Sequence, residues 1–129
     1  RIYLLCIAMM VVIYLIGGTC LIVFGDCAMS LIGSDTKFLE KSVIVVLLII
    51  SYLECNHAMS SGFISADNRI PFFIPSIISG VATVFLLWLF LDIFHLSLWG
   101  MILAPGISQL AYQNWKWPSV VIKELYFNK

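Results

Sequence analysis

The stretch VIVVLLII at residues 43–50 carries no polar side chain and decides which class of fold this chain can adopt. It lies inside a longer apolar run, residues 42–66, in which Glu54 is the only carboxylate. About 20 apolar residues in a helix cross the roughly 30 Å hydrocarbon core of a bilayer, because each residue rises about 1.5 Å. A helix in a soluble bundle would keep a polar outer face, which residues 43–50 lack. The run therefore predicts a transmembrane helix.

Three further runs of the same kind accompany this one. Residues 2–25, 70–91 and 97–115 contain no Lys, Arg, Asp or Glu. Lipid offers no partner for backbone N–H and C=O groups, so each run should be helical. We therefore expect an all-α integral membrane protein with four transmembrane helices in a single region, followed by a cytoplasmic tail at residues 116–129.

The composition excludes several other classes of protein. Apolar and aromatic residues make up 62% of the chain and charged residues 11%, whereas soluble domains average about 45–50% and about 25%. Seven Lys and Arg balance seven Asp and Glu, so the chain lacks the positive surplus of a nucleic-acid binder. The sequence contains no glycine-rich phosphate loop, nucleophile elbow or zinc-binding pattern of cysteine and histidine. We expect no enzyme activity, no metal site and no cofactor.

The positions of the cations predict the orientation. Lys and Arg accumulate on the cytoplasmic side of short loops. With four crossings, Lys37 and Lys41 lie on one side, and the other side holds more cations: Arg1, Arg69, Lys116, Lys123 and Lys129. Both termini are therefore expected in the cytoplasm. Trp115 and Trp117 bracket Lys116, which is typical of an aromatic belt with a snorkelling cation.

Turn-forming residues predict where the helices end. Residues 33–35, Gly-Ser-Asp, favour a break between the first two helices. Residues 67–71 predict a tight turn in which Asp67 or Asn68 caps the next helix and Pro71 occupies its first turn. Pro105-Gly106 predicts an interruption of the fourth run, either a structural kink or the broken helix of a transport site.

Glu54 lies near the middle of the second run, and its stripe is the main candidate for function. At helical spacing it shares one face with His57 and Ser61, and with Ser51 and Ser65 at the ends of the stripe. An ionisable group at that depth costs about 3 kcal/mol or more, so it should face a bundle interior or a watery cavity. Glu54, His57 and Ser61 either line a substrate pathway or proton site, or they pair with one another in a purely structural role.

Small residues at helical spacing predict close helix packing in the last two runs. The candidates are Gly80 in the third run and Gly100, Ala104 and Ser108 in the fourth. Small side chains let helix backbones approach closely in lipid. Gln109 and Gln113 share a face of the fourth run and are expected to bond a neighbouring helix.

Four segments together resemble a known family. They are ADNRIPF at 66–72, Ser-Gly at 79–80, LWGMILA at 98–104 and QLAYQNWKWP at 109–118. These segments resemble the C-terminal region of bacterial polysaccharide flippases, which export lipid-linked oligosaccharides of O-antigen or capsule. The fold of that family is similar to that of multidrug and toxin extrusion transporters. The resemblance covers residues 42–129, and residues 2–25 fit a preceding span.

The resemblance implies that the chain is a C-terminal fragment of a transporter with roughly twelve helices in two lobes. Its partners would be a lipid-linked oligosaccharide, membrane lipid and the missing N-terminal helices, in the bacterial inner membrane. The chain has no Lys or Arg inside a run, so basic cavity residues would have to come from the missing part. Alternatives are a small standalone protein acting in helix–helix assembly, a multidrug-type exporter fragment, or an integral membrane enzyme using Glu54 and His57.

Overall fold

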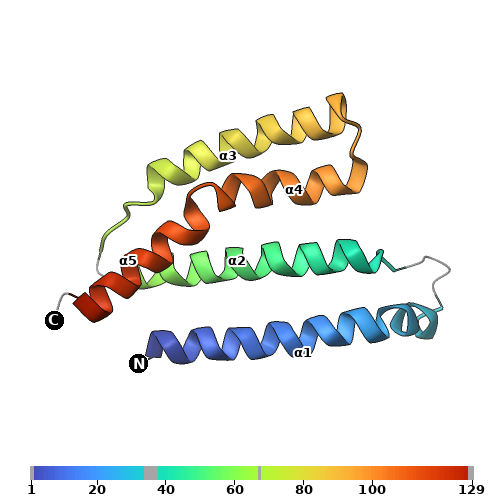
Figure 1. Cartoon of the computed structure of the whole chain (residues 1–129), viewed down its shortest axis with the longest axis horizontal. Helices are drawn as coiled ribbons and strands as arrows, with labels where there is room; N and C mark the ends of the chain where they lie inside the picture. The colour runs from blue at the N-terminus through green and yellow to red at the C-terminus, as the bar shows by residue number, and fades with distance from the viewer. Residues whose placement is uncertain (1, 34–37, 67, 128–129) are drawn as a thin grey trace. The chain divides into compact units, whose positions relative to one another are not determined.

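The computed structural model describes residues 2–33, 38–66 and 68–127, which form helices joined by short connections (Figure 1). The elements are α1 (Ile2–Leu31), α2 (Lys41–Ser65), α3 (Phe73–Trp88), the π-helical turn η1 (Leu89–Ile93), α4 (Ser97–Leu110) and α5 (Gln113–Phe127). The all-α expectation is confirmed for these residues.

Three of these segments are long and apolar enough to cross a membrane: α1, α2, and α3 continued by η1. This property agrees with a membrane location. The fourth expected span, residues 97–115, is divided between two helices, because α4 ends at Leu110 and α5 begins at Gln113. The 14 residues of α4 extend over about 21 Å, less than the thickness of the hydrocarbon core.

The interruption of the fourth run does not occur where the sequence predicts it. α4 continues through Pro105, although this proline cannot donate an N–H to the carbonyl of Met101. The break falls at residues 111–112, where Tyr112 N–H bonds to Gln109 O at 3.4 Å in a turn. The expected tail is also helical, since α5 extends to residue 127.

The connections around α1 and α3 also differ from the expected ones. α1 passes the expected end at Gly25 and ends before Gly33, whose φ of +71° suits a turn. The prediction for residues 34–35 lies outside the described residues. In the last turn of α1, the Ser30 side chain adds a hydrogen bond, because its Oγ donates to Cys27 O at 2.8 Å.

The expected cap of the third helix is wrong for Asn68. α3 begins at Phe73, and Phe72 caps it without a side-chain hydrogen bond. Asn68 instead has a φ of 57° in the preceding turn, and Asp67 lies outside the described residues. Pro71 disfavours the helical conformation of the residue before it, so the helix starts later and Pro75 occupies its first turn.

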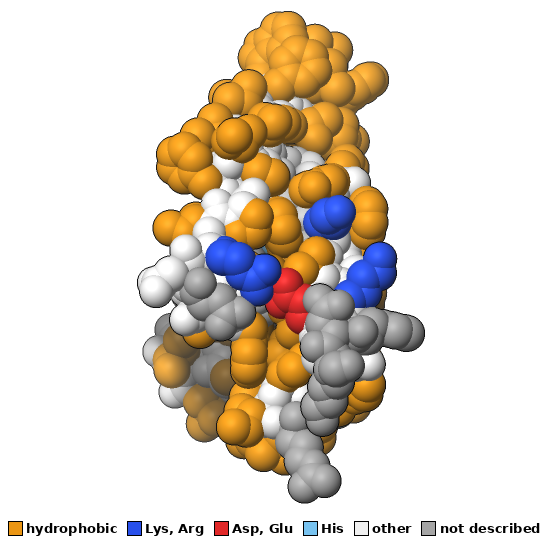
Figure 2. Space-filling model, turned by 90° about the vertical axis from the view of Figure 1, so that its left-hand side faces the viewer, with side chains coloured by type: hydrophobic (Ala, Val, Ile, Leu, Met, Phe, Trp, Pro, Cys, Tyr) orange, Lys and Arg blue, Asp and Glu red, His pale blue; other side chains and the backbone are white. Residues whose placement is uncertain are grey.

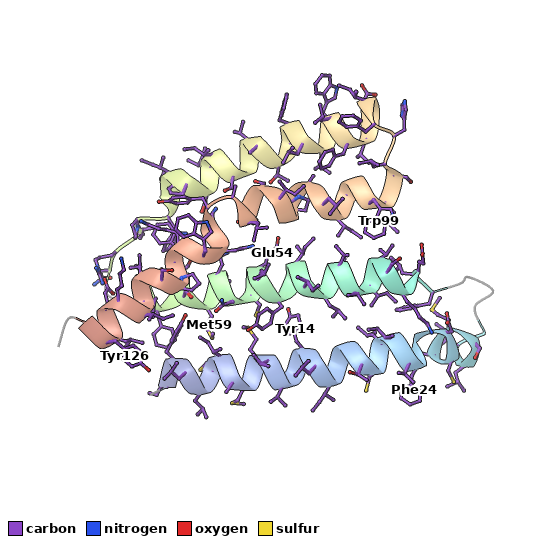
Figure 3. All side chains as sticks on the ribbon, in the orientation of Figure 1. Tyr14, Phe24, Glu54, Met59, Trp99 and Tyr126 are labelled. Atoms are coloured by element: carbon purple, nitrogen blue, oxygen red, sulfur yellow. The ribbon has the colours of Figure 1, made fainter. Side chains whose placement is uncertain are left out.

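The chain divides into two compact units, residues 1–52 and 53–129. In the first unit, the Tyr14 side chain points from α1 toward α2 (Figure 3). Its hydroxyl lies 2.9 Å from Ser51 Oγ and donates to Ser51 O at 3.1 Å. Tyr14 therefore links α1 to α2 by hydrogen bonds, which lipid cannot supply.

In the second unit, α3 and α4 form an antiparallel hairpin joined at η1 (Figure 1). Gly100 lies against η1: a Cβ at this position would lie 3.0 Å from Phe90 Cβ and 3.2 Å from Leu91 Cδ2. Ala104, one turn further along α4, is completely buried. Small residues on α4 therefore allow the two backbones of the hairpin to approach closely.

Candidate functional site: a buried polar cluster

A hydrogen-bonded cluster surrounds Gln113 in the second unit. Gln113 is the first residue of α5, and only 1% of its side chain surface is exposed. Its Nε2 donates to Ser79 Oγ on α3 at 3.1 Å, and its Oε1 accepts from Trp117 Nε1 at 3.2 Å. Both ends of the amide are thus bonded. We call Gln113, Ser79, Trp117, Ser108 and His57 together the Gln113 cluster.

The backbone carbonyl of Ser79 joins the cluster to α4. Ser108 Oγ donates to this oxygen at 2.7 Å, and Thr83 Oγ1 donates to it at 2.8 Å. A carbonyl oxygen has two lone pairs and can accept more than one bond. The Ser108 hydroxyl on α4 thus bonds directly to the backbone of α3, and this bond holds the two helices together near Ser79.

The local sequence explains why Gln113 points inward. The turn at residues 111–112 ends α4 and starts a new helix, so the faces of α5 are set independently of α4. Gln113 and Trp117 are four residues apart and therefore neighbours on one face of α5. The ring of Trp117 also meets Phe72 edge to face, with ring centroids 5.9 Å apart. The buried face of α5 thus combines aromatic packing with a satisfied indole N–H.

The second half of α2 brings two of the expected site residues to the cluster. The His57 side chain lies near the side chains of Gln113 and Glu54. The Glu54 side chain points from α2 toward α4 (Figure 3). Glu54 and His57 are three residues apart, so the helix places them side by side. Both residues therefore lie beside the Gln113 cluster.

The outer members of the expected stripe lie apart from this arrangement. Ser65 is exposed, and its Oγ donates to the backbone carbonyl of Ser61 at 2.9 Å. Ser51 bonds to Tyr14 within the first unit. The hydroxyl oxygen of Ser61 is buried and has no hydrogen-bond partner among the described residues. The two ends of the stripe, Ser51 and Ser65, therefore make structural hydrogen bonds, whereas Ser61 keeps a hydroxyl without a partner among the described residues.

Several other buried polar atoms of the second unit lack a hydrogen-bond partner among the described residues. Asn114 is 5% exposed, and both its Oδ1 and its Nδ2 are unpartnered. Asn56 Oδ1 and Gln109 Oε1 are unpartnered as well. Leaving a buried polar group unbonded costs about 1–3 kcal/mol, so such groups normally meet water, a ligand or another chain. The expectation that Gln109 bonds a neighbouring helix through this oxygen is therefore not met within the described residues.

The chemistry of the cluster is hydrogen bonding by mostly neutral groups. Amides, hydroxyls, one imidazole and one nearby carboxylate can bind polar groups such as sugar hydroxyls or water. Among the residues that the structure describes, no group of three or more His, Cys, Asp or Glu side chains could hold a metal ion. The four cysteines are free.

The residues expected to pack helices have different environments. Gly100, Ala104 and Ser108 are buried within the hairpin. Gly80 is exposed, and a Cβ placed there would meet nothing within 4 Å. Gly80 and Ser79 point to different sides of α3 because adjacent residues are about 100° apart on a helix. Helical spacing alone does not separate the inner side of α3 from the outer side, so the sequence does not single out Ser79 as a hydrogen-bonding residue.

The expected aromatic belt is wrong for Trp117. Trp115 is 55% exposed, whereas Trp117 is 4% exposed and belongs to the cluster. Residues two apart on a helix point about 200° apart, so the two indoles cannot share one surface. The spacing of Gln113 and Trp117 was the available signal for their contact.

Comparisons of the chain with family models, with curated proteins and with solved structures find no match.

Proposed function

We propose that this chain is part of a membrane transporter that flips lipid-linked oligosaccharide units across the bacterial inner membrane. The proposal rests on the resemblance to polysaccharide flippases. The observation that carries it is the position of Gln113 and Trp117, which belong to the 109–118 stretch of that resemblance. Both residues are buried and bonded to each other beside α3. A polar motif held inside an apolar bundle suits a transporter better than an exposed tail would.

The proposed topology has four crossings, with both termini in the cytoplasm. α4 alone is short, and we assign the remaining depth to the first turn of α5. Contacts along α3 support this assignment, because Gln113 bonds to Ser79 and Trp117 packs on Phe72, just before α3 begins. The rest of a two-lobed transporter of roughly twelve helices would supply the missing N-terminal helices.

In this proposal, the unpartnered polar atoms face the pathway of the polar headgroup. Asn114, Gln109 and Ser61 offer amide and hydroxyl groups without a partner among the described residues. Sugar hydroxyls both donate and accept hydrogen bonds, which makes neutral amides suitable partners. Rocking of the two lobes would expose these groups to one side of the membrane and then to the other. Glu54 and His57 would bind a proton or a polar headgroup beside them.

Glu54→Gln is expected to slow transport by about tenfold and to weaken its dependence on pH, because an amide cannot exchange a proton. A tenfold change corresponds to about 1.4 kcal/mol in the barrier. The measurement is the flipping of a fluorescent lipid-linked sugar in liposomes containing the full-length protein, at a series of pH values.

Glu40→Gln is the matched control, because Glu40 is exposed and precedes α2. It should leave the rate unchanged. If Glu54→Gln transports at the wild-type rate at every pH, the proposed role of Glu54 is refuted. The 129-residue chain alone should not flip the lipid, since four helices cannot enclose a headgroup of that size; flipping by this chain would contradict the fragment proposal.

A groove on α3 favours helix–helix assembly as a second candidate function. It is apolar and open, and its lining residues share the side of α3 that carries Gly80: Ile77, Gly80, Val81, Val84, Phe85 and Trp88. Grooves centred on glycine allow close approach of a second helix in lipid.

Gly80→Ile should fill this groove and reduce association of the chain with itself at least tenfold if assembly is the function. The effect follows from lost backbone contact with the second helix, since a Cβ at position 80 has no atom of the same chain within 4 Å. Förster transfer between labelled chains in liposomes measures the association. Unchanged transfer would exclude assembly through this face.

A further inference from the structure

The last helix, α5, has a buried side and an exposed side. Its inward side is formed by buried residues at helical spacing: Gln113, Asn114, Trp117, Pro118 and Val121. Its outward side carries Trp115, Ile122 and Tyr126, which are 55%, 41% and 58% exposed. These three residues lie seven and four positions apart and share one stripe. The helix therefore has an exposed aromatic and apolar side in addition to the side that packs against the protein.

The two lysines of α5 lie next to this exposed stripe. Lys116 and Lys123 are seven residues apart, so they project from one side of the helix, about 100° from Trp115. The Lys116 ammonium lies 6.0 Å from the ring centre of Tyr112. Neither lysine forms an ion pair with a carboxylate among the residues that the structure describes. Two cations thus border an apolar surface, with their charge not neutralised by the described part of the protein.

The contacts of α5 give its depth relative to the α2–α3 turn. Gln113 bonds to Ser79 inside α3, Trp117 packs on Phe72 at the start of α3, and Glu124 pairs with Arg69 in the turn itself. The Arg69–Glu124 pair is bidentate, with distances of 2.9 Å and 3.1 Å. α3 with η1 is long and apolar enough to cross a membrane, and such a crossing would put the turn that precedes it at a membrane face. The second half of α5 therefore reaches that face.

Charge complementarity indicates what covers the exposed side of α5. Figure 2 shows basic side chains gathered around an acidic one, beside hydrophobic surface. Arg69 and Glu124 neutralise each other, which leaves the positive charge of Lys116 and Lys123. A helix with Trp and Tyr on its apolar side and lysines at the border is typical of the membrane interface. Anionic lipid headgroups attract such lysines.

We propose that α5 leaves the hydrocarbon layer along its length and binds anionic phospholipid headgroups through Lys116 and Lys123, while the side with Trp115, Ile122 and Tyr126 faces lipid. The Arg69–Glu124 pair fixes the helix to the α2–α3 turn so that this side stays toward lipid. This inference concerns the lipid surroundings of the chain and is independent of what the chain transports.

Native mass spectrometry of the 129-residue chain, with equal amounts of phosphatidylglycerol and phosphatidylcholine of the same acyl chains, tests the proposal. Phosphatidylglycerol should bind preferentially. A lysine near an anionic surface contributes about fivefold in binding, so Lys116→Gln with Lys123→Gln should remove most of the preference. The double variant Lys116→Arg with Lys123→Arg retains both charges and should keep the preference for phosphatidylglycerol. Lys41→Gln, at the start of α2, is the matched control and should also keep it.

Salt provides a second test that needs no substitution. Raising the ionic strength from 0.1 M to 1 M shortens the screening length from about 10 Å to about 3 Å. In liposomes with brominated phosphatidylglycerol, quenching of tryptophan fluorescence should therefore decrease with salt, and more than with brominated phosphatidylcholine. Equal binding of the two lipids, a preference that the double Gln variant retains, or an equal loss in Lys41→Gln would each overturn the proposal.

Discussion

Gln113→Leu is expected to destabilise the second unit by about 2 kcal/mol and to lower its melting temperature in detergent micelles. The leucine fits the same space but cannot accept the Trp117 N–H or donate to Ser79 Oγ, which lie 3.2 Å and 3.1 Å from the amide. Each hydrogen bond between membrane helices contributes about 0.6 kcal/mol on average and up to about 1.7 kcal/mol. The indole N–H left buried without a partner adds a further cost.

Gln109→Leu provides the matched comparison, because it makes the same chemical change one turn earlier on α4. The Oε1 of Gln109 has no partner among the described residues, so its removal loses no such bond and should change stability by less than about 0.5 kcal/mol. Unfolding followed by circular dichroism measures both variants. If the two substitutions destabilise the protein equally, Gln113 is not the centre of a hydrogen-bonded cluster.

Gly100→Val should be the most damaging single substitution in the α3–α4 hairpin, at about 3 kcal/mol. A Cβ at this position would already lie 3.0 Å from Phe90 Cβ and 3.4 Å from the Phe90 backbone carbon. These atoms belong to the start of a side chain and to backbone, so they cannot move aside without displacing η1. Overpacking of this kind typically costs about 1–3 kcal/mol.

Gly80→Val tests the same change on the opposite side of the hairpin. Nothing lies within 4 Å of a Cβ at Gly80, and the cost in the single chain should therefore be close to zero. Thermal unfolding of the chain at high detergent-to-protein ratio, where association is suppressed, gives the comparison. Equal losses of stability would show that helix propensity, rather than contact with Phe90, limits position 100.

Spacing in the sequence was enough to place Glu54 beside His57, because a helix forces residues three apart together. It could not reveal that Gln113 lies near His57, because the two residues are 56 positions apart in the chain. The same limit applies to Trp117. Its type and its position near Lys116 are typical of a membrane interface, and only its packing on Phe72 shows that it is buried.

Local composition determined the helical class of this protein, because long runs without charge can satisfy their backbone groups in lipid only as helices. It also fixed the approximate limits of α2, which the apolar run predicts within a residue at each end. The break at residues 111–112, the inward direction of Gln113 and the choice of Gly100 rather than Gly80 for packing were decided by the tertiary structure. Run length and hydropathy describe how one helix meets lipid, whereas these three features depend on which side of the helix meets another helix.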